Sequence, residues 1–297
     1  MLPMELYLPP PPGVQDAPEW TGSAFQIGEG SSRILTYDVQ ADGWSDDLNH
    51  MLDEHGGEDH FMSVASRQNT IRALGKWLTR PRPRIIEIGC ASGYALQSMH
   101  RAFSGGMIIG ADPFAEVLNN VAQKLPDVPL LQFDLLKCPL PDRFVDAVVL
   151  LNVLEHIEDE NTALRHLFRI VRPGGIACIE VPAGPNLYDL YDRTLRHHRR
   201  YSMQALTATL EKTGFEILER SHLGFFVFPA FWVVKKRNRK YNALSPEEQK
   251  ARVLQNIKGA GNNTLLHWLM ATENWLRRKI YLPWGIRCFV VCRRNAD

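Results

Sequence analysis

Residues 85–94 read IIEIGCASGY, an apolar run followed by a glycine turn and the start of a helix. In an open α/β sheet, ligands bind where such a strand gives way to a helix. Gly89 and Gly93 let a ligand approach the backbone closely. A dinucleotide-binding fingerprint would have glycine where Ala91 and Tyr94 stand. The turn therefore predicts a ligand site of another kind, and the alternative is a strand, turn and helix without a ligand.

Apolar β-branched runs alternate with helical patterns on both sides of this turn, from about Phe61 onward. This alternation is typical of a parallel sheet with helices on both faces. We therefore predict a Rossmann-like, doubly wound α/β fold. The expected strands are 84–88, 107–111, 130–133, 145–151 and 176–181, and the expected helices are 61–78, one from about 94, 115–124 and 162–171.

The regular alternation of strand and helix patterns ends at Pro182. We expect a helix capped by Ser202 and closed by Gly214, then strands at 215–218 and 286–291. Between these strands, a capping box at 245–248 and an apolar stripe of Leu265, Leu269, Leu276 and Ile280 predict further helices. The expected segments are an extended N-terminal arm with an acidic stretch (1–60), the α/β core (61–222), a helical and aromatic insertion forming a cap or membrane dock (223–284) and the last strand of the core sheet (285–297).

Three carboxylates fall at the predicted carboxyl edge of the sheet. Glu87 precedes the glycine turn, where it would repel a pyrophosphate but suits a cation. Asp112 and Asp134 follow the next two strands, so all three would line one edge. Asp112 is placed to accept hydrogen bonds from both hydroxyls of a ribose, and Asp134 from an adenine amino group. Each acid alone has a loop residue or helix cap as its alternative.

The ordered motifs EIGCASG (87–93), GADP (110–113), FDL (133–135), FVDAVVLLNVLEHI (144–157) and VRPGG (171–175) resemble those of class I S-adenosylmethionine-dependent methyltransferases. The resemblance covers about 61–218 and implies a seven-stranded sheet whose last strand is antiparallel. It also implies S-adenosyl-L-methionine as the cofactor.

The resemblance assigns cofactor contacts along these motifs. Glu87, Gly89 and Gly93 would surround the methionine part of the cofactor. Ala91 replaces the usual middle glycine, which is a mild departure from the family pattern. An arginine that precedes the first strand in similar proteins matches Arg67, which would reach the cofactor carboxylate; the alternative is a solvated helix surface. The remaining predicted contacts are Cys90 and Tyr94 in the turn, Asp112 and Pro113 at the ribose, Asp134 and Leu135 at the adenine, and Asn152 beside the ligand.

The basic segment RTLRHHRRYS (193–202) resembles a narrower set of bacterial methyltransferases with H-x-R-R-Y-S, often found in glycan, lipid or secondary-metabolite pathways. Methyl transfer is an in-line displacement, and an oxygen or nitrogen nucleophile must also lose a proton. His197 is the first candidate base, and His156 is the second, with a structural hydrogen bond as its alternative. Arg200, with Arg199, would clamp an anionic acceptor or form a solvated face. Tyr201 would shape the pocket or pack.

No metal is predicted. Ubiquinone-pathway O-methyltransferases have an acid three residues before their Glu-His pair that helps to bind a metal, but Asn152 stands at that position. His50, His55 and His60 lie among acidic residues, and their spacing of five scatters them around a helix. We interpret this stretch as solvated.

Composition excludes several classes of protein. The 297 residues carry 34 Lys and Arg against 33 Asp and Glu, so no overall field favours nucleic acid. Five cysteines without a CxxC pair argue against a disulfide framework or zinc site and suit a cytoplasmic protein. The N-terminus does not read as a secretory signal, and no apolar run is long enough for a transmembrane helix. The aromatic run 223–234 with the basic run 235–240 predicts either peripheral membrane contact or a buried strand ending at a solvated turn.

The expected function is therefore transfer of a methyl group from S-adenosylmethionine to an oxygen or nitrogen of a small molecule, with anionic glycan, lipid or secondary-metabolite intermediates as candidates. The alternative is a non-catalytic S-adenosylmethionine-binding protein. An NAD-linked oxidoreductase is disfavoured by Glu87 and Tyr94.

Overall fold

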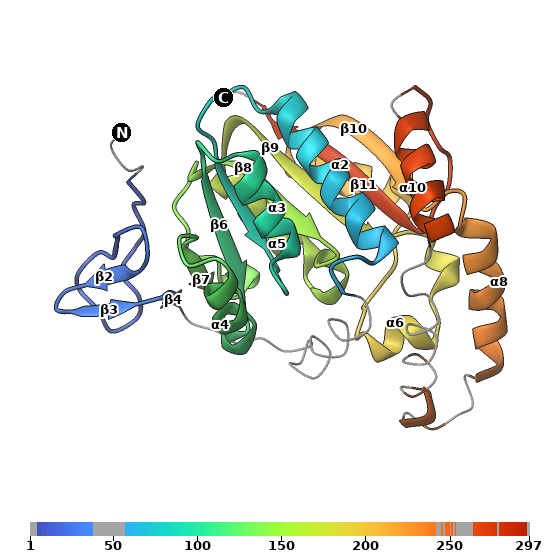
Figure 1. Cartoon of the computed structure of the whole chain (residues 1–297), viewed down its shortest axis with the longest axis horizontal. Helices are drawn as coiled ribbons and strands as arrows, with labels where there is room; N and C mark the ends of the chain where they lie inside the picture. Colours follow the sequence, from blue (N-terminus) through green and yellow to red (C-terminus); the bar gives the residue numbers. More distant parts are fainter. Residues whose placement is uncertain are drawn as a thin grey trace.

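The computed structural model describes residues 5–37, 57–241, 245, 247–249, 251, 253, 264–277 and 279–295. Its centre is an eight-stranded sheet in the order β10-β11-β9-β8-β5-β6-β7-β4 (Figure 1). Neighbouring strands run parallel from β4 to β9, and β11 is antiparallel to both β9 and β10. The predicted Rossmann-like fold with an antiparallel last strand is confirmed. The strands are β4 (Ile34–Thr36), β5 (Arg84–Ile88), β6 (Met107–Asp112), β7 (Leu130–Gln132), β8 (Val145–Leu151), β9 (Val171–Pro182), β10 (Phe215–Leu223) and β11 (Arg287–Arg294).

Helices cover both faces of this sheet. Successive side chains of a strand point to opposite faces, so Ile86 and Ile88 join the core under α5 and α7, while Ile85 joins the core under α2, α3 and α4. Strands buried on both faces read as continuous apolar runs, which is why their positions were predictable. The helices are α2 (Phe61–Trp77), α3 (Tyr94–Ala102), α4 (Ala115–Lys124), α5 (Glu160–Ile170) and α7 (Met203–Thr213).

The N-terminal region is more than the extended arm that we predicted. Strand β4 pairs in parallel with β7, and this makes eight strands where seven were expected. Ahead of it, β1 (Glu19–Trp20), β2 (Phe25–Ile27) and β3 (Gly30–Ser32) form a small sheet at the left of Figure 1. Phe25 and Leu35 are fully buried in the core. A three-residue strand whose partner is remote in sequence carries no local periodic signal, so the sequence did not reveal it.

The insertion between β10 and β11 is helical, as predicted. The apolar run after Leu223 forms helix α8 (Phe228–Asn238), so the alternative of a buried strand is wrong. Ser245 and Glu248 exchange the two hydrogen bonds of the predicted capping box. Helix α10 (Thr264–Leu276) packs on the core beside α2 (Figure 1).

Other local signals also hold. Ser202 Oγ accepts a hydrogen bond from the backbone N of Ala205, and Gly214 ends α7 with a φ of 109°, so both predicted ends of that helix are confirmed. Strand β9 is longer than expected, because the VRPGG segment already pairs with β8 at Val171. The five cysteines are free and buried.

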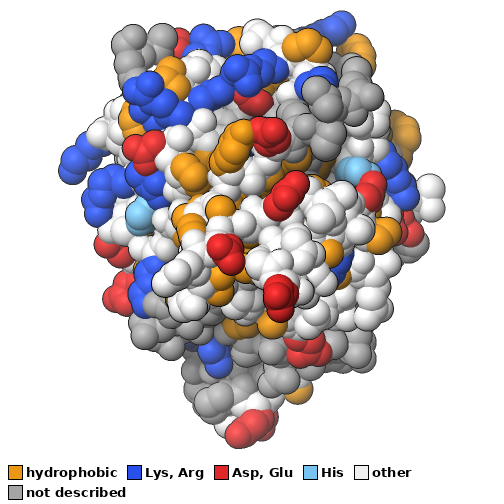
Figure 2. All heavy atoms as spheres, turned by 90° about the vertical axis from the view of Figure 1, so that its left-hand side faces the viewer, with side chains coloured by type: hydrophobic (Ala, Val, Ile, Leu, Met, Phe, Trp, Pro, Cys, Tyr) orange, Lys and Arg blue, Asp and Glu red, His pale blue; other side chains and the backbone are white. Residues whose placement is uncertain are grey.

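The surface on the N-terminal side, seen in Figure 2, mixes acidic, basic and hydrophobic side chains, in keeping with the net charge of +1. Among the helices that the structure describes, none is both long and apolar enough to cross a bilayer.

Candidate functional site

The glycine turn closes directly onto the end of β6. The backbone N–H groups of Gly89 and Cys90 both donate to Ala111 O, at 2.8 and 3.0 Å. Gly89, with a φ of 75°, leaves no room for a side chain, because a Cβ there would lie 2.4 Å from Val153 Cγ2. Ala91 has a φ of 43°, a left-handed conformation that non-glycine residues rarely adopt. The turn is thus held tight, with its backbone at the carboxyl edge of the sheet.

Asp112 ties this turn to β6. Its carboxylate accepts hydrogen bonds from the backbone N of Ala91 and of Phe114, each at 3.1 Å. The carbonyl of Pro113 accepts from Gln132 Nε2 and so joins the same edge to β7. Asp112 therefore has a structural role besides the predicted ribose contact, and its side chain is 5 % exposed.

Asp134 caps the short helix η1 (Leu135–Lys137) through a 2.9 Å hydrogen bond from the backbone N of Leu136. This was the alternative that we considered for each acid. The cap also fixes the carboxylate at the carboxyl end of β7, one strand away from Asp112, while Leu135 is buried beside it. The predicted order of Glu87, Asp112 and Asp134 along adjacent strands is present.

A carboxyl oxygen and a guanidinium nitrogen, both buried near the turn, lack hydrogen-bond partners among the described residues. Glu87 Oε2 and Arg67 Nη1 have no hydrogen-bond partner among the described residues, although buried polar atoms are normally satisfied. Burial and the neighbouring Asp112 raise the pKa of Glu87 to about 8. Arg67 Nη2 donates a hydrogen bond to Glu58 O, and Arg67 Cζ lies 6.0 Å from the centre of the Tyr94 ring. A ligand carrying both an ammonium and a carboxylate would satisfy both atoms.

The turn's remaining predicted residue, Cys90, is buried in the core under α2, and burial raises the pKa of its thiol well above the usual value. It therefore contributes backbone to the site rather than a reactive sulfur.

Asn152 is fixed by a buried network at the end of β8. Its side-chain nitrogen donates to Glu180 Oε1 at 3.0 Å, and it has a left-handed φ of 56°. The same Glu180 oxygen accepts from Ser66 Oγ and from Arg287 Nη1, at 2.7 and 2.6 Å. Glu180 is fully buried, so these three donors compensate its charge. Their network also fixes Asn152 next to Val153, the residue that lies against Gly89 of the glycine turn.

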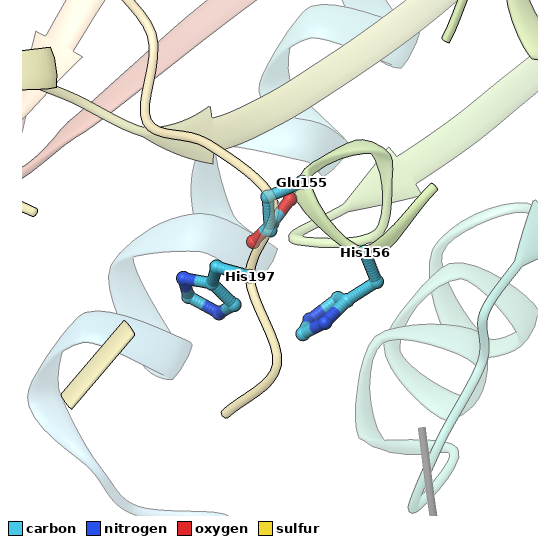
Figure 3. Close-up of side chains that lie close together, drawn as sticks. All are labelled: Glu155, His156 and His197. Carbon is cyan, nitrogen blue, oxygen red and sulfur yellow. The ribbon is translucent and has the colours of Figure 1, made fainter. Parts of the chain in front are cut away.

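Glu155, His156 and His197 come together past the end of β8 (Figure 3). One potential ligand atom from each lies within 4.8 Å of the others, and the two imidazole rings meet edge-on at 4.7 Å. Neither oxygen of Glu155 has a hydrogen-bond partner in the part of the chain that the structure describes, and burial raises its pKa to about 8. Burial and His197 lower the pKa of His156 to about 3, so His156 is neutral at physiological pH.

Asn152, whose side chain was one ground for predicting no metal, binds Glu180, and Glu155, His156 and His197 form a separate group of potential ligands. Carboxylate and imidazole are common metal ligands. The absence of a metal stays a prediction. His50, His55 and most of the acids around them lie outside the described residues; His60 is described, and burial lowers its pKa to about 4.

His197 is oriented by a carboxylate. Its Nδ1 lies 3.0 Å from Asp192 Oδ1, an arrangement that fixes the ring and leaves Nε2 as the acceptor nitrogen of the neutral form. Asp192 is fully buried in helix α6 (Leu190–Thr194) and is also bound by Arg200 Nη1 at 2.8 Å and Lys235 Nζ at 2.8 Å. Burial would raise the pKa of Asp192, but the hydrogen bond from His197 and the two cations outweigh it and hold the carboxyl ionised. Burial lowers the pKa of His197 itself, and Asp192 opposes that shift.

Arg200 and Tyr201 are placed differently from the acceptor contacts that we predicted. The buried guanidinium of Arg200 donates to Ala183 O as well as to Asp192. Tyr201 is 6 % exposed, and its hydroxyl donates to Glu160 Oε2 at 2.7 Å. Arg199 donates to the carbonyls of 157 and 158. This geometry favours a structural role for all three, because they hold the segment that carries His197.

Asp192 and Glu155 are the residues that sequence reasoning missed. Asp189 and Asp192 are three positions apart and form a reciprocal capping box around α6, so their spacing was a usable signal for the helix. The contact with His197 was not readable, because it depends on the turn that follows α6.

Comparisons with known proteins agree with this architecture. The family model described as "Methyltransferase domain" matches residues 59–220. A "Probable S-adenosylmethionine-dependent methyltransferase" of Mycolicibacterium smegmatis is 32 % identical over 135 residues, which is 45 % of this chain and 52 % of that protein. The chain spans about half the length of the first curated relatives that it matches.

Two solved structures show the same fold at low identity. A phosphoethanolamine N-methyltransferase 2 of Haemonchus contortus, in complex with S-adenosyl-L-methionine, has a TM-score of 0.54 and 16 % identity, covering 84 % of this chain and 57 % of that chain. The [4+2]-cyclase SpnF has a TM-score of 0.57 and 16 % identity, covering 87 % and 99 %. Since the family model spans more than half of the 297 residues and coincides with the sheet and its glycine turn, the chain belongs to the methyltransferase domain family.

Proposed function

We propose that the chain is an S-adenosylmethionine-dependent methyltransferase that methylates an oxygen or nitrogen of a small molecule. The pair of unpartnered buried atoms, Glu87 Oε2 and Arg67 Nη1, is the observation that carries this proposal. The cofactor's amino-acid part offers an ammonium for Glu87 and a carboxylate for Arg67. The glycine turn lies at the carboxyl edge of the sheet, and Asp112 and Asp134 follow at the ends of the next two strands, where we expect them to bind the ribose and the adenine.

When bound, the cofactor supplies an electrophilic methyl group on a sulfonium. The residues of this chain would then align the acceptor and take its proton. His197 is neutral at physiological pH because burial lowers its pKa, and Asp192 holds its Nδ1, so Nε2 is the nitrogen available to accept that proton. His156 packs against His197 and helps to shape the acceptor side.

The cofactor half of the proposal is tested by calorimetric titration with S-adenosylmethionine, S-adenosylhomocysteine and NAD. We expect binding of both adenosyl ligands and none of NAD. Arg67→Met should lower the affinity for S-adenosylmethionine by at least about tenfold, because it removes a charge-assisted hydrogen bond to the cofactor's carboxylate. The control, Arg101→Met, changes an exposed arginine on α3 and should bind as the wild type does. Equal affinities in the two variants would contradict the assignment.

The catalytic half is tested by an acceptor screen of phenols, sugars and lipids, with release of S-adenosylhomocysteine as the readout. His197→Gln should bind the cofactor normally and lose about 10²–10⁴-fold in turnover, the usual contribution of a general base. A specific observation keeps a second candidate open, since one structural neighbour is a [4+2]-cyclase rather than a methyltransferase by name. Cofactor binding without methyl transfer to any acceptor would favour a non-methylating role.

A further inference from the structure

Exposed large hydrophobic side chains are concentrated in the insertion. Twelve such side chains occur among the described residues, and all but Tyr7 and Val14 lie between 226 and 284. Four of the chain's seven tryptophans are among them, each at least 41 % exposed. Exposed hydrophobic side chains clustered in this way mark an interaction surface. The members are Phe226, Trp232, Val233, Val234, Leu265, Trp268, Trp275, Ile280, Tyr281 and Trp284.

Helix α10 is apolar on two opposite faces. On its inner face, Met270 packs into the core, and Glu273 accepts hydrogen bonds from the backbone N of Gly224 and Phe226. On its outer face, Trp268 and Trp275 are 62 % and 54 % exposed. The inner contacts fix α10 against the protein, so Trp268 and Trp275 cannot turn into the core and stay exposed unless a partner covers them. The predicted apolar stripe of this helix is therefore divided: Leu269 packs inward, and Leu265 is 60 % exposed.

Helix α8 also combines a buried contact with exposed apolar side chains. Its inner residue Lys235 is buried and binds Asp189 and Asp192, at 2.6 and 2.8 Å. Trp232 and Val233 are 41 % and 49 % exposed. In Figure 1, α8 and α10 lie together on the right of the molecule, on the side away from the small N-terminal sheet.

Basic side chains accompany the exposed tryptophans. Lys236 Nζ lies 3.7 Å from the Trp232 ring centre, and Lys279 Nζ lies 4.5 Å from the Trp275 ring centre. On the described parts of α8 and α10 the acidic residue is Glu273, and it is fully buried. The surface therefore combines tryptophan with positive charge and presents no exposed carboxylate from these two helices.

This combination identifies the partner. Tryptophan favours the boundary between headgroups and acyl chains, and lysine and arginine favour anionic headgroups. Lysine is depleted in interfaces between proteins, which argues against a second copy as the occupant. We propose that the outer faces of α8 and α10, with the 280–284 segment, form a docking surface for an anionic lipid bilayer. The tryptophans enter the headgroup region, and Lys236, Arg237 and Lys279 bind the lipid phosphates.

The test is flotation of the full chain with vesicles of phosphatidylcholine alone or with about 30 % phosphatidylglycerol. We expect binding to the anionic vesicles at low salt, loss of most binding at about 0.5 M NaCl because of screening, and a blue shift of tryptophan fluorescence. Trp268→Ala and Trp275→Ala should each weaken binding about tenfold by removing buried apolar area. Lys236→Gln with Lys279→Gln should weaken binding to anionic vesicles only.

Tyr7→Ala is the matched control, because it removes a 71 % exposed aromatic residue from the opposite end of the molecule. It should bind vesicles as the wild type does. Far-UV circular dichroism and S-adenosylmethionine titration check that each variant is folded. Absence of flotation at low salt would overturn the proposal, as would equal losses in Trp268→Ala and Tyr7→Ala. A concentration-dependent dimer abolished by Trp268→Ala would instead assign the surface to a second copy. None of these outcomes depends on methyl transfer.

Discussion

Gly89 is the residue on which the site's shape depends most directly. Gly89 and Gly174 share nearly the same left-handed φ, 75° and 76°, but a Cβ at Gly174 would meet nothing within 4 Å. Gly174→Ala should therefore cost only about 1 kcal/mol of backbone strain. Gly89→Ala adds the clash with Val153 and should also abolish cofactor binding. Urea unfolding and calorimetric titration separate the two effects, and normal cofactor affinity in Gly89→Ala would contradict this account of the turn.

Glu155 gives the protein a pH dependence of known sign. Its folded pKa is raised to about 8 by burial, above the value of about 4.3 in an unfolded chain. Protonated Glu155 therefore contributes its full stabilisation of the folded state below the unfolded pKa, and this contribution is lost as pH rises through about 8. Glu155→Gln removes this titration, so the stability of the variant relative to the wild type should rise by on the order of 3 kcal/mol between pH 5 and pH 9. Thermal unfolding across that range measures it. Glu158→Gln, which changes an exposed neighbour, should follow the wild type, and parallel curves for all three proteins would refute the prediction.

Buried polar side chains of α8 join it to α6: Lys235 pairs with Asp189 and Asp192, and Asn238 donates a hydrogen bond to Asp189. Lys235 forms ion pairs with both Asp189 and Asp192, and Asp192 in turn orients His197. Lys235→Met would leave two buried carboxylates undercompensated, which should cost about 3–5 kcal/mol and reduce turnover. Lys236→Met, one position along the same helix, alters an exposed side chain and should change stability by less than about 0.5 kcal/mol. Chemical denaturation of both variants checks the difference. A small loss in Lys235→Met would show that the network does not hold these helices together.

Elements with a local pattern were predictable, and contacts between elements were not. The strand and turn at 84–93 and the caps of α7 follow from neighbouring residues, so the sequence was sufficient for them. By contrast, Lys235 reaches Asp192 only because α8 packs against α6, and Arg200 reaches it only because the chain turns back after α6. The sequence alone therefore predicts that the basic segment 193–202 is solvated or binds the acceptor, although Arg200 is buried in the structure.

At the scale of the whole molecule, the N-terminal region and the α/β core form one hydrophobic unit. Leu6, Leu8 and Phe25 belong to the same buried cluster as the strands of the central sheet. This continuity was invisible in the sequence, because the proline-rich start has no strand or helix periodicity of its own. A parallel strand at the sheet edge also covers backbone groups of β7 that would otherwise be open to another chain.

Because β4 belongs to the same core, a destabilising substitution in β4 should lower the free energy of unfolding of the entire protein. Leu35 is fully buried, so Leu35→Asp would place a charge in the core and should cost at least about 3 kcal/mol in the free energy of unfolding. Thr36→Asp changes the next residue, which faces solvent, and should cost under about 1 kcal/mol. In urea, tryptophan fluorescence and far-UV circular dichroism should lose signal together, with both midpoints lowered in Leu35→Asp. If the N-terminal region were an independent arm, residues 61–222 would unfold independently of β4. Leu35→Asp would then keep the wild-type urea midpoint for the core.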